Sequence, residues 1–368
     1  MLKMPPLTNR FIKLSLWLVG GITLILAVLA VAVWTLTFHP EAVQPAPVVC
    51  TGNPHPLTPG QTVKIVSWNV QYMAGKGYWF FYEGGTDSAP TKADIRQTLE
   101  QAARVIKAED PDIVLLQEID EAARRTHYTD QLKLLQKHLD ERYPCRTDAF
   151  YWKSGFVPHP DIWGPVGMKL VILSKYRISK ATRHQLPLIP ENWVSRQFNL
   201  KRALLAARIP FKDTEFVVMN THLSAFAQGT DTMERQVAAV KSILTGQTQA
   251  GRPWIIGGDF NLLPPGNAYS ELTEQQKSAY RPQTEIKPLF EAFHVIPDPK
   301  DLSGPNRHNW FTHFPNDPDI NAPNKTIDYI FYADSLKRQS AHVRQADTWN
   351  ISDHLPVVAE FTMPRGSK

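Results

Sequence analysis

Polar side chains recur at the ends of six apolar segments of this sequence, and these residues are the ones that could do chemistry. Together they offer carboxylate, amide and imidazole groups: Asn69, Glu118, Asn220, His222, Asp259, Asn261, Asp328, Asp353 and His354. If the segments are strands that share one edge of a sheet, these side chains converge there. Oxygen ligands with two histidines suit a hard cation such as Mg²⁺, with Mn²⁺ as the alternative, and no Cys/His cluster typical of zinc accompanies them.

The spacing within two of the segments supports this convergence. Asn220 and His222 are two residues apart, as are Asp259 and Asn261, so in an extended chain each pair points to the same face. Taken one at a time, each residue also has an ordinary structural interpretation. Asn69 could end a strand in a turn, Asp259 and Asn261 could form a turn, and a single histidine could be a buried structural residue. The ordered set is what favours function.

The elements that must position these residues are short apolar strands alternating with amphipathic helices. Continuous apolar runs are typical of strands covered on both faces. The predicted strands are 63–68, 113–117, 169–173, 203–209, 216–220, 254–257, 326–331 and 357–361. Apolar residues recurring every three to four positions predict helices over 94–107, 130–142 and 230–244. Lys169 interrupts an otherwise apolar strand, and the sequence offers no reason for it.

Residues 14–38 contain no charged side chain over 25 positions, which is long enough to span a bilayer as a helix. Lys3, Arg10 and Lys13 precede this run without an acidic residue, which predicts a cytoplasmic N-terminus over residues 1–13. A cleaved signal peptide is the alternative, although its apolar region is typically shorter, about 7–15 residues. We therefore expect a single-pass membrane protein.

Residues 39–61 contain six prolines and predict an extended linker to a folded domain over residues 62–363. This topology places the domain on the non-cytoplasmic side, with the periplasmic face of a bacterial inner membrane favoured. Cys50 and Cys145 would then face an oxidising compartment, where they could pair or remain separate.

The net charge of +5 gives little support to nucleic-acid binding. Five basic residues near the chain ends carry the whole excess: Lys3, Arg10, Lys13, Arg365 and Lys368. Without them, 40 − 5 = 35 basic residues balance 35 acidic ones, so residues 14–363 are formally neutral. A protein that binds DNA mainly through phosphate neutralisation usually keeps a basic excess in its domain.

Six motifs in a fixed order give the chain a resemblance to a known family. SWNV, LLQEID, NTHL, GGDFN, TIDYIF and SDHLPV resemble the motifs of the endonuclease/exonuclease/phosphatase superfamily, the deoxyribonuclease I-like fold, over roughly residues 62–362. The resemblance implies an α+β fold, a four-layer α/β/β/α sandwich, preceded here by one transmembrane helix. It also implies a metal-dependent phosphoric ester hydrolase.

The resemblance assigns a role to each matching position. Glu118, Asn69 and Asp353 would bind the metal, Asp259 would orient or deprotonate the attacking water, and Asn261 would hold the phosphate and that water. His222 would donate to a phosphate oxygen, and His354 would act opposite the phosphorus with its charge set by Asp328. Asn220 would contact the substrate. These roles are physically coherent because a phosphoester needs its negative oxygens neutralised and an in-line water oriented.

The superfamily includes nucleases and lipid phosphodiesterases, so the motifs alone do not choose the substrate. The expected membrane anchor, the neutral domain and the aromatic loops 71–82 and 309–314 favour a lipid-linked or small phosphodiester, as in the sphingomyelinase and glycolipid-processing branches. The alternatives are an exported nuclease and a catalytically silent binding protein of the same fold. Residues 79–82 could equally form a hydrophobic plug beneath the loop.

Overall fold

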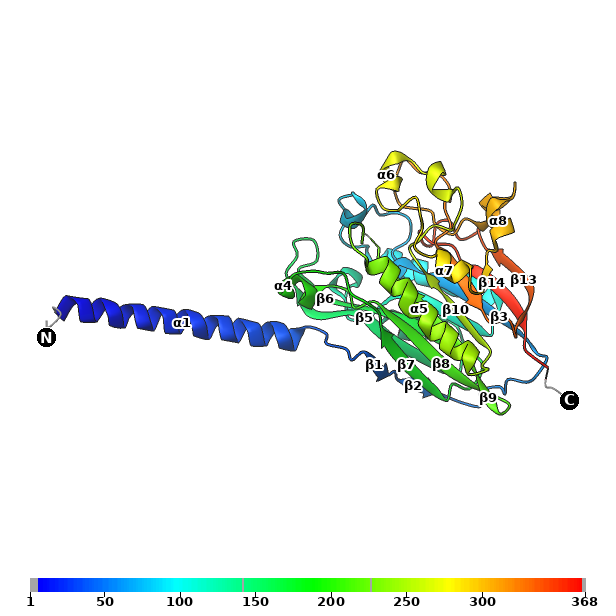
Figure 1. Cartoon of the computed structure of the whole chain (residues 1–368), viewed down its shortest axis with the longest axis horizontal. Coiled ribbons are helices and arrows are strands. Elements are labelled where there is room, and N and C mark those ends of the chain that lie inside the picture. Colours follow the sequence, from blue (N-terminus) through cyan, green and yellow to red (C-terminus); the bar gives the residue numbers. More distant parts are fainter. Residues whose placement is uncertain (1–5, 141, 226, 366–368) are drawn as a thin grey trace.

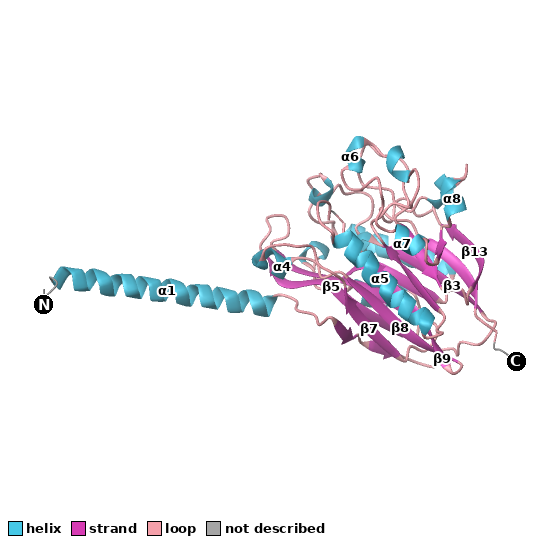
Figure 2. Ribbon diagram, in the orientation of Figure 1, coloured by secondary structure: helices cyan, strands magenta, loops and turns pink. Residues whose placement is uncertain are grey.

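The computed structural model describes residues 6–140, 142–225 and 227–365, and it contains two seven-stranded sheets packed face to face with helices on both outer faces (Figure 1). Residues 1–5 of the predicted cytoplasmic segment lie outside the described residues. The four-layer α/β/β/α sandwich is confirmed. Figure 2 shows that the longer loops and several short helices gather at one end of the two sheets.

The first sheet contains a parallel pair in an otherwise antiparallel arrangement. Its order is β1 (Val43–Pro45), β7 (Lys180–Gln185), β8 (Ala203–Phe211), β9 (Thr214–His222), β10 (Trp254–Asp259), β12 (Asp328–Tyr332) and β11 (His294–Ile296). β9 and β10 are the parallel pair, and α5 (Thr232–Gln249) connects them. Parallel strands need such a crossover, and their carboxyl ends therefore lie at the same edge of the sheet.

The second sheet repeats this arrangement. Its order is β13 (Lys337–Val343), β14 (Val357–Thr362), β3 (Thr62–Asn69), β4 (Ile113–Asp120), β6 (Gly164–Ser174), β5 (Cys145–Val157) and β2 (Val48–Cys50). β3 and β4 are parallel and are connected by α2 (Lys92–Glu109). The eight predicted strands are all present, although several are longer than expected.

The helices cover the outer faces because each presents one apolar stripe. In α2, Ile95, Leu99 and Ile106 are buried in a core shared with α3 (Gln131–His138) and the outer face of the second sheet. α5 and α7 (Lys287–Phe290) cover the first sheet in the same way. The remaining helices are α4 (Trp193–Phe198), α6 (Glu274–Lys277), α8 (Pro299–Ser303) and the 3₁₀ turns η1 (Gln71–Met73), η2 (Phe81–Glu83), η3 (Arg124–Thr126), η4 (Ala268–Glu271) and η5 (Arg307–Trp310).

Lys169, which the sequence left unexplained, lies on β6 and forms ion pairs. Its Nζ is 3.0 Å from Asp148 Oδ1 on the neighbouring strand and also contacts Glu121. A nearly buried ammonium group is tolerated here because both partners are carboxylates.

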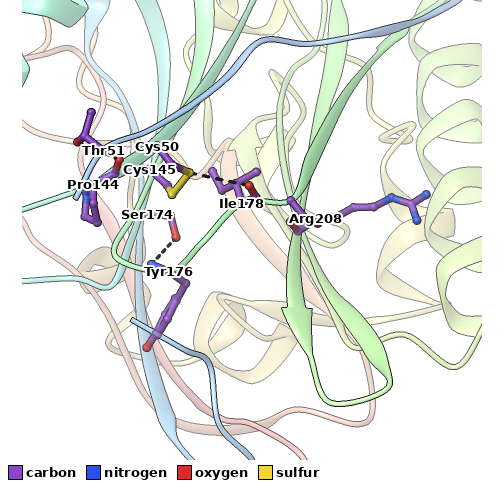
Figure 3. Close-up of a disulfide and its surroundings, with 9 residues drawn as sticks. Cys50, Thr51, Pro144, Cys145, Ser174, Tyr176, Ile178 and Arg208 are labelled. Atoms are coloured by element: carbon purple, nitrogen blue, oxygen red, sulfur yellow. Dashed lines mark hydrogen bonds between the residues drawn. A yellow bond between two sulfur atoms is a disulfide. The ribbon is translucent and has the colours of Figure 1, made fainter. Parts of the chain in front are cut away.

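The proline-rich segment differs from the extended linker that the sequence predicts. Within it, β1 pairs with β7 and β2 pairs with β5, so both strands are joined to sheet edges. Cys50 and Cys145 form a disulfide that fixes β2 to β5 (Figure 3). Beside the disulfide, the Thr51 amide donates to the Pro144 carbonyl at 2.8 Å. The segment is therefore held against the domain at several points.

α1 (Pro6–Leu36) extends away from the domain as a single long helix (Figure 1). Its stretch from Arg10 to Leu36 has the length and composition of a membrane-spanning helix, and its most apolar window is not buried in the domain. At about 1.5 Å per residue, these 27 residues extend for about 40 Å, which exceeds the thickness of a bilayer's hydrocarbon core.

Candidate active site

All of the predicted polar residues except Asn220 come together at the loop end of the two sheets. Asn69, at the end of β3, lies between carboxylates from both sheets. Its Nδ2 donates to Glu118 Oε1 at 3.1 Å and to Asp259 Oδ2 at 3.0 Å. One amide therefore joins the ends of β3, β4 and β10, which confirms that these strand ends share one site.

A β-bulge aims the Glu118 side chain. The pairing of β4 with β6 is interrupted between Leu116 and Ile119, and Glu118 has a φ of 61°. A bulge inserts an unpaired residue and turns its side chain, which explains how Glu118 leaves the alternation of its strand. Burial, followed by the negative charge of Asp353, raises the pKa of Glu118 to about 7.

The two sheets approach each other closely beside Asp259. A Cβ atom at Gly257 would lie 2.7 Å from Leu115 Cδ1 and 2.9 Å from Ser67 Oγ of the facing sheet. A larger residue would have to displace both side chains, which favours glycine at the first position of the GGDFN motif. Burial raises the pKa of the Asp259 carboxyl to about 6. Asp259 Oδ1 also accepts a hydrogen bond from the backbone N–H of Asn261 at 2.9 Å.

His354 and Asp328 form a buried pair directly beside Asp259. His354 Nδ1 is 2.8 Å from Asp328 Oδ2, and its Nε2 is 3.5 Å from Asp259 Oδ2. Burial lowers the pKa of His354, but the charges of Asp328 and then Asp259 and Asp353 oppose it and raise this pKa well above the ordinary value. These carboxylates therefore favour the protonated form of the His354 imidazole, whose Nε2 faces Asp259.

The surroundings of His222 shift its pKa in the opposite direction. Its Nε2 is 3.1 Å from Asp259 Oδ2, and its Nδ1 is 3.2 Å from the Tyr151 hydroxyl. Burial, assisted by the nearby charges of Arg202 and His354, lowers the pKa of His222 well below its usual value. The surroundings therefore shift the pKa values of the two histidines in opposite directions, favouring the neutral form of His222, which can donate one hydrogen bond.

Asp353 adds another carboxylate to the groups that could bind a metal ion. It is nearly buried, its Oδ1 is 4.0 Å from His354 Nε2, and burial raises its pKa. Ligand atoms of Asp259, Asp328 and His354 lie within 4.8 Å of one another, as do those of His313, Asp353 and His354. Carboxyl groups at this density are short of positive charge, so the donors fit a hard divalent cation.

Asn220 differs from the other residues because its side chain does not reach this cluster. It is completely buried between the sheets, where its Nδ2 donates to the Leu116 and Val171 carbonyls and its Oδ1 accepts from Gln117 Nε2 at 2.7 Å. It shares a face with His222, as expected, but lies one pleat deeper. With its amide fully used in holding the two sheets together, it is not placed to contact a substrate.

Comparison with known proteins identifies the family. The profile described as the endonuclease/exonuclease/phosphatase family matches residues 66–354, which is most of the chain. The chain belongs to this family. No curated protein sequence matched.

Several solved structures of the family resemble this chain. An endonuclease/exonuclease/phosphatase from Beutenbergia cavernae DSM 12333 is 20% identical, with a TM-score of 0.56 over 82% of this chain and 72% of the other. The human Nocturnin catalytic domain with bound sulfate is 19% identical, with a TM-score of 0.51 over 86% and 98% of the two chains. A family protein from Leptotrichia buccalis C-1013-b is 14% identical, with a TM-score of 0.51 over 81% and 99%. At these identities the likeness shows the fold.

This family member also brings charged residues to the site that the sequence analysis missed. Burial lowers the pKa of Lys76 and of Lys325 to about 8, and the negative charge of the nearby Asp353 partly opposes this shift. His313 stacks edge-on against His354, with ring centroids 4.6 Å apart. No strand end precedes Lys76, which lies in the loop after η1, so the pattern that revealed the other residues could not reveal it.

The aromatic loop after β3 is both a plug and part of the rim. Phe80 is buried with Tyr72, whereas Tyr82 remains exposed and its hydroxyl lies 2.6 Å from that of Tyr72. Tyr82 also lines a cavity of about 270 Å³ next to the cluster, together with Asn261, His313 and Lys325. A compact organic group could occupy this space beside the polar centre.

Proposed function

We propose that this protein is a membrane-anchored, Mg²⁺-dependent phosphodiesterase that hydrolyses a lipid-linked or small phosphodiester. The observation that carries the proposal is the buried cluster in which Asn69 joins Glu118 to Asp259 while the His354–Asp328 pair faces the same carboxylate. Membership of a family of phosphoester hydrolases supports the reaction class.

Asn69, Glu118 and Asp353 are the residues that would hold the metal. Their oxygen atoms and the burial of both carboxylates match the preference of Mg²⁺. When bound, the ion would neutralise phosphate oxygens and stabilise the leaving alkoxide.

The chain's own residues divide the remaining work. Asp259 has a pKa of about 6, near neutrality, so it can align a water molecule and accept its proton. The backbone of Asn261 is fixed by Asp259, which places its side chain at the edge of the cavity. Protonated His354, held by Asp328, offers positive charge to a phosphate oxygen, and neutral His222 offers a hydrogen bond.

Three features favour a lipid-linked or small substrate over DNA. α1 has the length and apolarity to hold the domain at a bilayer. The excess positive charge of the chain lies at its ends, so the domain has no net positive charge with which to neutralise the phosphates of a long nucleic acid. The cavity beside the cluster is compact and mixes apolar with polar side chains.

The Cys50–Cys145 disulfide supports a non-cytoplasmic domain, because structural disulfides persist mainly in oxidising compartments. Together with the basic residues before the apolar run, it favours a cytoplasmic N-terminus and a periplasmic or luminal site.

The test is hydrolysis by the full chain, purified in detergent and supplied with Mg²⁺, of parallel panels of phospholipids, glycolipid phosphodiesters and DNA. We expect turnover of a lipid phosphodiester, loss of that turnover in Asn261→Ala, and little change in the control Asn267→Ala, whose residue lies exposed in the same loop. Rapid DNA nicking without lipid turnover would support the exported nuclease instead. No turnover of any phosphoester would support a silent binding protein.

A further inference from the structure

The end of α1 is fixed to the folded domain instead of leading into a free tether. The Leu36 carbonyl accepts a hydrogen bond from Ser154 Oγ of β5 at 3.3 Å, and Thr37 forms an isolated β-bridge with Ser154. The His39 ring stacks on Trp34 with centroids 3.8 Å apart and its Nε2 contacts Thr37 Oγ1. If α1 spans a bilayer, these contacts hold β5 at the membrane surface.

The same end of the domain exposes large apolar side chains. Trp163, in the turn between β5 and β6, is 58% exposed, and Trp193 and Val194 at the start of α4 are 55% and 54% exposed. Trp163 and Trp193 are the two most exposed tryptophans among the described residues outside α1. Full exposure of such residues to water is unfavourable by about 25 cal/mol for each Å² of apolar surface.

Contacts between these elements place them on one surface around the end of α1. Trp152 Nε1 of β5 donates to the Phe198 carbonyl at the end of α4 at 2.8 Å. Phe156 of β5 packs edge-on against Trp163, with centroids 5.3 Å apart. Figure 1 shows α4 and the ends of β5 and β6 as the part of the domain nearest to the C-terminal end of α1.

We propose that this surface, formed by Trp163 with the β5–β6 turn and by Trp193 and Val194 of α4, lies in the headgroup region of the bilayer that α1 spans. Tryptophan favours that region because its ring is apolar and its N–H can still bond to water or headgroups. The inference rests on the membrane anchoring in the proposed function and adds that the domain itself docks on the lipid surface.

Docking would set the height of the active site above the membrane. Phe81, in the aromatic loop at the rim of the site, stacks on His159 in the β5–β6 turn with centroids 5.3 Å apart. The rim is therefore joined directly to the proposed lipid contact. A phosphodiester carried by a lipid would then approach the site from the side of the rim that Phe81 forms.

The test uses the full chain reconstituted into phosphatidylcholine vesicles, with and without bromine near the headgroup end of the acyl chains, because bromine quenches nearby tryptophan. Subtracting the emission of Trp163→Phe/Trp193→Phe from that of the unmodified chain isolates the emission of these two residues. Trp349→Phe provides the matched control. Trp349 lies in the loop before β14, is 36% exposed and contacts Phe314 near the active site, outside the proposed docking surface. Trp17→Phe/Trp34→Phe isolates the emission of the anchor.

We expect most of the Trp163/Trp193 emission and most of the Trp17/Trp34 emission to be lost in brominated vesicles, while the Trp349 emission persists. Quenching of Trp17/Trp34 alone would overturn the docking surface but leave the anchor and the proposed reaction standing. Quenching of neither pair would overturn both the docking and the anchoring. Because phenylalanine replaces exposed tryptophan in every variant, we expect all variants to fold, which circular dichroism checks.

Discussion

Replacing Asp328 with Asn tests whether the His354–Asp328 pair sets the charge of the imidazole. The Asp328 side chain is 2% exposed and that of His354 is 6% exposed. Asp328 Oδ2 and His354 Nδ1 are 2.8 Å apart, so their charge-assisted hydrogen bond is shielded from water. Such bonds contribute about 1.5–3 kcal/mol, and Asp328→Asn should lower the free energy of unfolding by about this amount. The amide keeps the size of the carboxyl group and removes only its charge.

Loss of the Asp328–His354 interaction should also lower the rate of hydrolysis. If the protonated imidazole is needed in the transition state, a loss of about 1.5–3 kcal/mol corresponds to a fall in kcat of about 10- to 150-fold at neutral pH. The pKa of His354 is raised in the folded chain, so its contribution to stability is complete below the ordinary histidine pKa and is lost as pH rises through the raised value. The stability difference between the variant and the unmodified chain should therefore narrow at high pH.

The assays are urea unfolding across pH and hydrolysis of the substrate found in the lipid and DNA panels. Asp334→Asn is the matched control, because Asp334 forms a similar pair with His294 at 3.3 Å whose side chains are 88% and 57% exposed. We expect that variant to leave both stability and rate unchanged. An Asp328→Asn protein with the stability and kcat of the unmodified chain would refute the assigned role of the pair.

Two further predictions concern stability. Asn220→Ala should lower the free energy of unfolding by about 1–3 kcal/mol, because Gln117 Nε2 loses its shortest hydrogen bond and the Leu116 and Val171 carbonyls lose the Asn220 donor. Urea unfolding measures this, and an unchanged midpoint would mean that Asn220 does not join the sheets. Replacing Cys50 and Cys145 together with Ser opens a loop whose ends are 95 residues apart, which should cost up to about 4.7 kcal/mol. Equal unfolding midpoints for the Cys50→Ser/Cys145→Ser variant and the unmodified chain, both without reductant, would contradict the pairing.

The sequence predicted the strand ends well because their pattern is local. Buried strands read as continuous apolar runs, and a polar residue directly after such a run is visible without any knowledge of the fold. Within each sheet the parallel pair places two of these strand ends at the same edge. Asn69 and Asp259 end strands of different sheets, so their contact depends in addition on how the two sheets pack against each other. Family motifs then supplied roles that the spacing alone did not.

Other features depend on packing between sheets and could not be predicted from the sequence. Asn220 and His222 share a face as their spacing predicted, but only the distance between the sheets decides that Asn220 is enclosed and His222 reaches the cluster. The bulge at Glu118 breaks the alternation of β4 and leaves no mark in the sequence. Strand β5 also escaped prediction, because its apolar residues fall in short groups separated by polar ones.

The segment 39–61 shows how composition can mislead. Its prolines indicate an extended chain, and the chain is extended, but β1 and β2 find partners at sheet edges where proline is tolerated. This pairing involves β7 and β5, which lie far along the chain. A window of local sequence contains no information about such partners.

The most direct test of the proposed metal site is the affinity of the full chain for Mg²⁺, measured by isothermal titration calorimetry. Glu118→Gln keeps the shape of the side chain and removes its charge, and Glu274→Gln, at a residue exposed on α6, is the control. We expect Glu118→Gln to weaken Mg²⁺ binding by about 100-fold or more, and the control to bind as the unmodified chain does. Unchanged Mg²⁺ affinity in Glu118→Gln would contradict the assignment of this cluster as the metal centre of a phosphoesterase.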